Sequence, residues 1–400
     1  MTDKMQVNLR QVAMEILYEV QKNNGLLHVV LSDALKKYQY LDKNERSFIS
    51  RLVQGTEERK IELDYIIDSF SKTPVKKQKD VIRIILEMSV YQLKYMDSVP
   101  ASAVCNEAVK LAVKKNFGTL RGFVNGVLRN IARNIDNIEY PDKSTNTDKY
   151  LSVKYSVPEE LAGYFLKKFG DNETEEMFEA FNKDKSTYIR CNTKKTDIAG
   201  LTAALEAEGV TVTNEGIDKR IDYALKISGY DYLGGLKSFR DGLFFVQDIS
   251  SMLASQGGFI KRDAYVIDVC AAPGGKSINA ALMADIGHVS SRDISGRKVS
   301  LIKENAERLG IDNITYKVWD AVKKDEESVE KADVLICDLP CSGLGIIGRK
   351  PDIKYNVTYE KIKELALLQR KILSTVWEYV KKDGILIYST CTVTPEENAE

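Results

Sequence analysis

The sequence predicts a multidomain protein with an all-α N-terminal bundle, a small α+β middle domain and a doubly wound α/β C-terminal domain. Three observations support this prediction. Apolar residues recur only at helical spacing up to about residue 135, short strands and helices then mix, and apolar strands finally alternate with helices. The 400 residues are enough for three domains, which we place at 1–140, 141–234 and 235–400.

Composition favours a cytoplasmic protein with real hydrophobic cores. The chain is 44% apolar and 29% charged, as in ordinary globular domains. Its six cysteines are unevenly spaced and do not resemble a disulfide framework, which favours a reducing compartment. We find no apolar run of membrane-spanning length and no signal-peptide pattern at the start. We therefore expect no membrane partner.

Charge is divided unevenly along the chain. Residues 1–135 hold 22 Lys and Arg against 15 Asp and Glu, a net +7, so the remainder holds 36 against 43, a net −7. A basic region joined to an acidic one indicates a polyanionic partner for the first part. Chance scatter of solvated charges is the competing explanation.

The last helix of the N-terminal region carries a basic ridge. Its apolar face includes Val124 and Leu128, whereas Arg121, Arg129 and Arg133 follow another ridge at multiples of four residues. Guanidinium groups in a row suit phosphate contacts, so we expect RNA binding here. A solvated helix face with local ion pairs is the alternative.

The middle region begins after a polar segment, residues 136–150, that we interpret as a linker. Helices are expected at 158–169, 173–182 and 198–208, and strands at 188–192, 210–213 and 223–227. Arg190 alternates with apolar residues in the first strand, which predicts a polar, ligand-facing strand face.

In the C-terminal region, apolar strands are expected at 265–269, 288–294, 314–319, 334–338 and 384–389, with helices at 276–283, 296–309 and 359–380. This alternation predicts a parallel sheet. The chain ends in what reads as the first turn of a helix, with Thr394 as cap and Pro395 after it. We therefore expect a further C-terminal segment that completes the sheet.

A glycine-rich turn follows the first strand of that sheet. It comprises Cys270, Ala271, Ala272, Pro273, Gly274, Gly275 and Lys276. Small residues allow a ligand close to the backbone, and the following helix N-terminus favours negative groups. A P-loop would need glycine at Cys270, and a dinucleotide fingerprint would need Gly-x-Gly-x-x-Gly, so both are excluded. An ordinary strand-to-helix turn is the alternative.

Two acids stand at the ends of the next two strands. Asp293 lies 19 positions after Gly274, where an acid accepts hydrogen bonds from a ribose in such folds. Asp320 ends the third strand and would face the exocyclic amine of an adenine. Together they predict a cradle for an adenosine ligand, although an acid at a strand end is often only a helix cap.

Two cysteines follow the last two strands. Cys341 stands in Asp338-Leu-Pro-Cys-Ser-Gly, and Cys391 stands in Tyr-Ser-Thr-Cys. A thiolate that adds to carbon-6 of a cytosine makes carbon-5 nucleophilic toward a sulfonium methyl donor, and an acid such as Asp338 assists at ring nitrogen-3. The alternative is that both cysteines are small hydrophobic residues buried in the core. Spacing does not assign the two cysteine roles.

Histidine and metal chemistry are not expected. The two histidines, His28 and His288, have no Cys or His neighbour at metal-ligand spacing. We therefore expect neither a metal site nor a Ser-His-Asp mechanism.

These motifs resemble those of the Sun-type RNA 5-methylcytosine methyltransferases, and the helical region resembles the NusB-type RNA-binding domain found on the family's ribosomal RNA members. The resemblance implies a Rossmann-like methyltransferase domain and S-adenosylmethionine as the cofactor. It implies that Cys391 is the nucleophile and that Cys341 assists product release. It also implies cofactor contacts from residues 270–276, Asp293, Asp320 and Asp338.

The resemblance further implies RNA contacts. Tyr188–Thr193, with Arg190, resembles the family's RNA-contacting element, and Arg349–Asp352 resembles its substrate-side loop. Arg292 departs from the pattern, because a smaller or apolar residue is expected before Asp293.

We therefore expect a monomeric, cytoplasmic enzyme that methylates carbon-5 of a cytosine in small-subunit (16S) ribosomal RNA. The same chemistry on transfer RNA or DNA, and a non-catalytic RNA-binding assembly or antitermination factor, remain alternatives.

Overall fold

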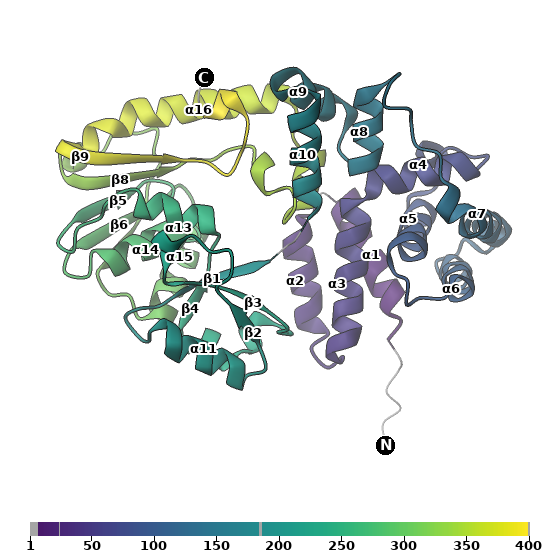
Figure 1. Ribbon diagram of the computed structural model, residues 1–400, viewed down its shortest axis with the longest axis horizontal. Helices are drawn as coiled ribbons and strands as arrows, with labels where there is room; N and C mark the ends of the chain where they lie inside the picture. Colours follow the sequence, from purple (N-terminus) through teal and green to yellow (C-terminus); the bar gives the residue numbers. More distant parts are fainter. Residues whose placement is uncertain (1–6, 24, 184–185, 399–400) are drawn as a thin grey trace. The chain divides into compact units, whose positions relative to one another are not determined.

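The computed structural model describes residues 7–23, 25–183 and 186–398, and the chain divides into two compact units (Figure 1). The helical unit comprises the residues up to Lys183 together with Gly345–Tyr359. The sheet unit comprises the rest of the chain, up to Leu344 and again from Glu360 onward. This division into two units coincides with neither of the boundaries expected from the sequence, at 140 and at 234. The three expected domains stay a prediction.

The helical unit is built from ten α-helices among the described residues. Their bounds are α1 Leu9–Lys22, α2 Leu27–Lys37, α3 Lys43–Glu58, α4 Lys60–Phe70, α5 Asp80–Tyr95, α6 Ala101–Lys114, α7 Arg121–Asn134, α8 Thr147–Tyr155, α9 Glu159–Phe169 and α10 Asp171–Asn182. Local signals set several starts. Asn8 accepts a hydrogen bond from the Gln11 backbone at the start of α1, and Asp42 forms a capping box with Glu45 at α3.

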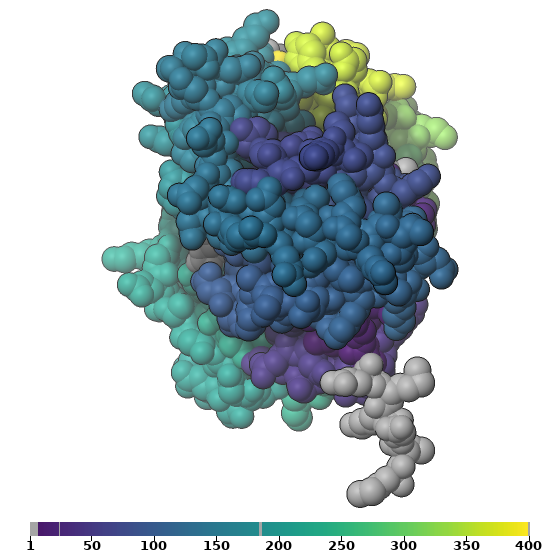
Figure 2. Space-filling model, turned by 90° about the vertical axis from the view of Figure 1, so that its right-hand side faces the viewer, coloured from purple at the N-terminus to yellow at the C-terminus, as the bar shows by residue number. Residues whose placement is uncertain are grey.

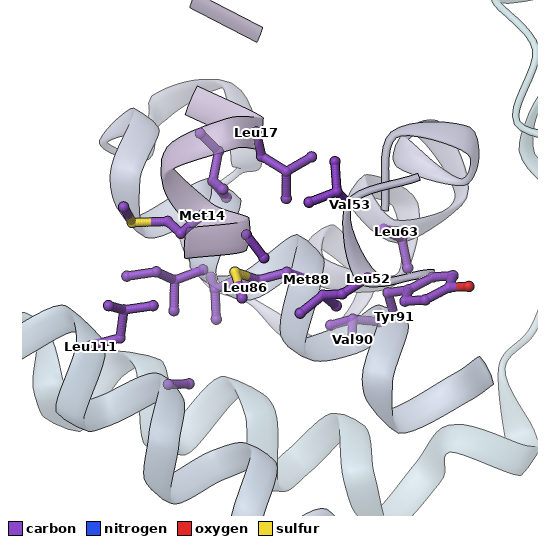
Figure 3. Packing of buried hydrophobic residues seen from close by; sticks show 14 of the residues in the cluster. Met14, Leu17, Leu52, Val53, Leu63, Leu86, Met88, Val90, Tyr91 and Leu111 are labelled. Carbon is purple, nitrogen blue, oxygen red and sulfur yellow. The ribbon is translucent and has the colours of Figure 1, made fainter. Parts of the chain in front are cut away.

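One apolar cluster forms the core of this unit (Figure 3). Leu17 from α1, Leu52 from α3 and Leu86 from α5 are fully buried in it. A Cβ on Gly55 would lie only 2.0 Å from the Tyr91 ring, so this position of α3 requires glycine. The amphipathic helices expected from the sequence are confirmed.

The segment expected to be a linker is bonded to the helical unit. The Tyr65 hydroxyl donates to the Glu139 carbonyl at 2.9 Å, and the Tyr140 hydroxyl donates to the buried Glu62 carboxylate. Helix α8 begins already at Thr147. Residues 136–150 are therefore partly ordered by contacts that their composition does not reveal.

Residues 345–359 also pack within the helical unit, although they follow Cys341 by only a few positions. Lys354 donates to the Glu58 carbonyl at 2.7 Å, and the Tyr355 hydroxyl donates to the Glu57 carbonyl at 2.8 Å. These bonds satisfy carbonyls that the end of α3 leaves without helical partners. The positive charge of Lys354 also complements the helix dipole there.

In the sheet unit, a small antiparallel sheet has the order β2-β3-β1-β4. Its bounds are β1 Thr187–Cys191, β2 Thr211–Thr213, β3 Ala224–Ser228 and β4 Phe244–Val246, with helix α11 Ile198–Ala207 between β1 and β2. Strand β4 was not expected, because three residues are too few to show an alternating pattern. It lies beyond the expected boundary at 234, yet it pairs with β1.

The larger sheet has five parallel strands in the order β7-β6-β5-β8-β9 (Figure 1). Its elements are β5 Tyr265–Asp268, β6 His288–Asp293, β7 Ile314–Val318, β8 Ala332–Asp338, β9 Val380–Ser389, α13 Ile249–Gln256, α14 Gly275–Met283, α15 Gly296–Leu309 and α16 Tyr359–Val376. The doubly wound, Rossmann-like fold is confirmed. The strand order reverses between β5 and β8, and ligands of such folds bind at that switch point, outside the carboxyl ends of the strands.

Among the described residues, none of the helices combines the length and the apolar character that a membrane span requires.

Candidate active site at the carboxyl edge of the parallel sheet

The glycine-rich turn links β5 to α14 beside the switch point. Gly274 has φ +104°, a left-handed conformation that side chains disfavour, and it caps the N-terminus of α14. The Gly274 amide donates to the Ala271 carbonyl at 2.7 Å, and the Ala271 amide donates to the Arg292 carbonyl at 2.8 Å. The turn is thus held against β6 with its backbone at the ligand edge.

Asp268, the last residue of β5, is a buried carboxyl that we had not assigned a role. The Ser277 hydroxyl donates to it at 2.6 Å. Burial raises the pKa of Asp268 to about 7, and the nearby charge of Asp338 also raises it, whereas the Ser277 bond and Lys276 lower it. The signal in the sequence was an acid at the end of an otherwise apolar strand.

Asp293 and Asp320 stand at the carboxyl ends of β6 and β7, as expected. Asp293 is buried and accepts a hydrogen bond from the Ala272 amide at 3.2 Å, with the Lys298 ammonium at 3.5 Å. Asp320 is half-buried and accepts from the Val322 amide at 3.2 Å. Asp293 therefore ties the glycine-rich turn to the neighbouring strand end.

Asp338 joins the two sides of the switch point. Its carboxylate lies 2.7 Å from the Lys276 ammonium, which comes from the turn after β5. Its other oxygen accepts from the Ser389 hydroxyl at 2.9 Å, at the end of β9. The fixed carboxylate thus stands between the glycine-rich turn and the two cysteine-bearing loops.

The two cysteine-bearing loops bring their thiols together. The Sγ atoms of Cys341 and Cys391 are 3.2 Å apart, and the Cys391 amide donates to Cys341 Sγ at 3.3 Å. Cys391 is exposed and Cys341 is half-buried. The contact with Cys391, followed by burial, raises the pKa of the Cys341 thiol. Cys341 therefore keeps its proton, which it can share with the more accessible sulfur.

Two other thiols near this edge are suited to packing. Burial raises the pKa of Cys270 to about 12, and burial also raises the pKa of Cys337. A thiol held in its protonated form is a poor nucleophile. Among these thiols, only Cys391 is exposed, and Cys341 lies beside it.

Arg292 is the residue that departs from the family's sequence pattern. Its side chain does not point to the edge of the sheet where a ligand would bind. Its guanidinium donates to Asp325 at 3.0 Å and to Ser328 at 2.7 Å, and it lies over the Tyr379 ring. Successive side chains of a strand point to opposite faces, so Arg292 is turned away from the side of Asp293. The buried ion pair explains why a large cation fits there.

The candidate RNA-binding arginines occupy different environments. Arg121, Arg129 and Arg133 are exposed on α7. Figure 2 turns the blue helices of the helical unit toward the viewer. Arg349 is exposed in the segment that packs within the helical unit. These four arginines therefore belong to the helical unit.

Arg190 lies inside the sheet unit. It is 1% exposed, and it donates to Gln247 and, at 2.8 Å, to the Gly275 carbonyl. Burial lowers the pKa of Arg190 to about 9. The ligand-facing strand face expected at Arg190 is instead packed against protein, so an RNA contact there would require the unit to open.

No group of three or more potential metal ligands occurs among the described residues.

Comparisons with known proteins identify related families and relatives. Residues 260–400 match the family described as 16S rRNA methyltransferase RsmB/F, and residues 7–133 match the NusB family. A probable ribosomal RNA small subunit methyltransferase B of Bacillus subtilis is 36% identical over 98% of this chain and 87% of the relative. A relative with the same description from Synechocystis is 33% identical, with the same coverage.

Two solved structures are also similar. The crystal structure of PH0851 has a TM-score of 0.80 at 26% identity and covers 99% of this chain and 89% of that one. The structure of NSun6 from Pyrococcus horikoshii with SFG has a TM-score of 0.55 at 23% identity, covering 60% of this chain and 85% of that one, and supports the fold.

Proposed function

Because this chain belongs to the family of ribosomal RNA small subunit methyltransferases B, we propose that it methylates carbon-5 of a cytosine in 16S ribosomal RNA through a covalent bond between Cys391 and the base. The observation that carries the proposal is the pair of thiols, 3.2 Å apart at the ends of adjacent strands beside Asp338. Two sulfurs at that separation can act on one nucleobase.

S-adenosylmethionine is the cofactor, and when bound it supplies a methyl group on a positively charged sulfur. The residues at the carboxyl edge fit such a ligand. A left-handed glycine at the start of α14 allows close approach of the backbone. Asp293 would hold the ribose hydroxyls, Asp320 the adenine amine, and residues 270–276 with Asp338 the remainder.

Cys391 is suited to the first step. It is the exposed member of the pair, and Cys341 holds a proton that can be donated to its sulfur. The Cys391 thiolate adds to carbon-6, while Asp338 in its protonated form donates a hydrogen bond to ring nitrogen-3, which draws electron density away from the ring. Carbon-5 thereby becomes the nucleophile that accepts the methyl group.

Cys341 is suited to the last step. After methyl transfer, the proton on carbon-5 must pass to a base, and the bond between carbon-6 and Cys391 then breaks, which restores the thiolate. Cys341 lies beside the departing sulfur and assists this elimination. A base inside a duplex is out of reach, so the cytosine must leave its stack, in a loop or in partly unfolded RNA.

The experiment uses purified full-length variants, S-adenosylmethionine and transcribed 16S RNA, with methyl incorporation and denaturing gels as readouts. Cys391→Ala should abolish methyl transfer and form no adduct, whereas Cys341→Ala should accumulate a covalent protein–RNA adduct. Cys105→Ala, a buried thiol of the helical unit, is the matched control and should do neither. Full turnover by Cys391→Ala would overturn the proposal.

The choice of RNA is tested in the same assay. We propose that the basic helical unit favours ribosomal RNA, and that the protein acts as a monomer in the cytoplasm without a metal. Transfer RNA offered at equal concentration should accept far less methyl. Equal methylation of both RNAs would contradict the substrate assignment but leave the thiol chemistry in place.

A further inference from the structure

Glu397 is a buried carboxylate bonded to Ser342, the residue that follows Cys341. It ends the short 3-10 turn Pro395–Glu397 and is 1% exposed. Its oxygens accept hydrogen bonds from the Ser342 amide at 2.8 Å and from the Ser342 hydroxyl at 2.5 Å. They also accept from the Thr394 hydroxyl at 2.7 Å and from the Gln369 amide at 3.2 Å. A buried carboxylate is tolerated because four donors surround it.

The donors come from three different elements of the sheet unit. Ser342 follows Cys341 in the loop after β8, Thr394 lies in the loop after β9, and Gln369 comes from α16. Gln369 also donates to the Pro340 carbonyl at 2.9 Å. One carboxylate thus joins both cysteine-bearing loops and fixes them to a helix.

A second contact runs directly between the two loops. The hydroxyls of Ser342 and Thr392, the residues that follow the two cysteines, are 2.7 Å apart. Both hydroxyls are buried, so the bond is shielded from water and strengthened by its neighbours. A polar network therefore links the residues that directly follow the two cysteines.

We propose that Glu397 is the positioning residue that holds Cys341 and Cys391 at one nucleobase. This inference rests on the proposed function, because it concerns the step that needs both thiols. Glu397 acts through Ser342 and Thr394, and its carboxylate is too deeply buried to reach the substrate. Its effect should be greatest on product release, since the first attack needs only Cys391.

Glu397→Ala should therefore uncouple the two steps. The variant still forms the bond between Cys391 and carbon-6, but Cys341 is no longer held beside it. We expect turnover to fall about 10- to 100-fold, as for a small misplacement of a reacting group. A covalent adduct should accumulate during the reaction, at a lower level than in Cys341→Ala.

Glu397→Gln separates positioning from proton transfer. Its amide oxygen can accept from the Ser342 and Gln369 amides, and its NH₂ group can donate to the Ser342 and Thr394 hydroxyls, which rotate to accept. Ser342 then donates to Thr392. The network survives, so this variant should keep turnover within about threefold of the wild type and show no adduct. Strong loss of turnover in Glu397→Gln would overturn the positioning role.

A matched control removes a similar carboxylate elsewhere in the sheet unit. Glu208 accepts the Lys237 amide at 2.5 Å and the Ser238 amide at 3.0 Å, away from either thiol. Glu208→Ala should lower the thermal midpoint of the full chain without adduct formation. If Glu397→Ala does not fold, Ser342→Ala removes only the hydroxyl bonds and should still give the adduct.

The outcomes are decisive. Adduct in Glu397→Ala or Ser342→Ala, with none in Glu397→Gln or Glu208→Ala, supports the inference. Folded Glu397→Ala with wild-type turnover and no adduct overturns it, provided that Cys341→Ala does form adduct. Failure of Cys341→Ala or Cys391→Ala to behave as expected instead counts against the proposed function.

Discussion

Buried carboxyl groups occur in both units, but their neighbours differ. In the helical unit, Glu87 of α5 is fully buried and forms an ion pair with Arg83 at 2.7 Å, and Arg83 also pairs with Asp64. In the sheet unit, the half-buried Asp338 ends β8 and accepts a hydrogen bond from Ser389, whereas the buried Glu397 ends the turn Pro395–Glu397 and accepts from Ser342.

These two sets of acids differ in what their carboxyl groups contact. In the helical unit, the carboxyl groups of Asp64 and Glu87 both contact the Arg83 guanidinium, which joins α4 to α5. The acids of the sheet unit accept hydrogen bonds from residues close to the two thiols, and we propose that they orient these reactive groups. A perturbed pKa alone therefore does not mark an active site, because structural ion pairs also perturb pKa values. Position at the carboxyl edge of the sheet is the discriminating observation.

The largest effect is expected for Asp338→Asn. An amide keeps the size of the side chain but loses both the negative charge that pairs with Lys276 and the acidic proton that would be donated to the ring nitrogen. Methyl transfer should fall by about 10² to 10⁴-fold, the usual contribution of a positioned acid or base. Initial rates of methyl incorporation measure this, and Asp333→Asn, on the same strand but at its other end, is the control. Equal rates for the two variants would remove Asp338 from the chemistry.

The corresponding change in the helical unit is Arg83→Met. It leaves Asp64 and Glu87 without their cation, and breaking a buried pair on one side costs about 3–5 kcal/mol. Denaturant unfolding of the full chain should show early loss of the helical unit, while S-adenosylmethionine binding to the folded protein persists. Lys22→Met breaks an exposed pair with Asp80 and should cost under about 1 kcal/mol. Equal costs for the two variants would make the buried cluster irrelevant to stability.

Sequence reasoning located most of the sheet unit because its signals are local. The parallel strands were expected within a few residues, since each is an apolar run between turn residues, and the Cys341 and Cys391 motifs follow such runs. The meeting of the two thiols followed from the rule that parallel strands end at one edge. The RNA contact of Arg190 stays a prediction, and alternation along a strand did not reveal that this side chain is buried.

What the sequence did not reveal depends on contacts between distant residues. Glu397 looked like an acid in a helix first turn, and only the fold brings Ser342, 55 residues earlier, to its carboxylate. Lys354 and Tyr355 bond α3 carbonyls almost 300 residues away. Such partners leave no periodicity, so a single sequence carries no sign of them.

A smaller effect is expected in the pH dependence of stability, through the buried Glu87 of the helical unit. Burial, and next the charge of Asp64, raises the pKa of Glu87 to about 8 from 4.5. The folded state therefore keeps a proton that the unfolded state loses. That stabilisation is complete below the unfolded pKa and is lost as pH rises through about 8. The thermal midpoint of the wild type should fall between pH 6 and pH 9 relative to that of Glu87→Gln.

The expected difference in midpoint is several degrees, because about 1 kcal/mol shifts the midpoint of a unit of this size by about 2–4 °C. Glu19→Gln, an exposed acid of α1 in the same unit, should follow the wild type at both pH values. Parallel curves for Glu87→Gln and the wild type would show that Glu87 is already ionised in the folded protein.

The smallest effect is expected on the surface of the helical unit, where charge is exposed and screened. Replacing Arg121, Arg129 and Arg133 with Ala should weaken RNA binding at low salt and leave turnover at saturating RNA unchanged. If each arginine meets a phosphate, the slope of log K against log salt should become shallower by about 2, at about 0.7 for each phosphate that is no longer neutralised. Fluorescence titrations of 16S RNA at several salt concentrations measure this.

The control for this surface removes the same charge elsewhere. Arg220, Lys237 and Arg262 are exposed cations of the sheet unit, each already paired with a nearby Asp. Their triple Ala variant should keep the wild-type salt slope, because those charges are satisfied within the protein. If both triple variants reduced affinity equally, binding would follow net charge alone, and the ridge on α7 would have no special role as the surface that receives RNA.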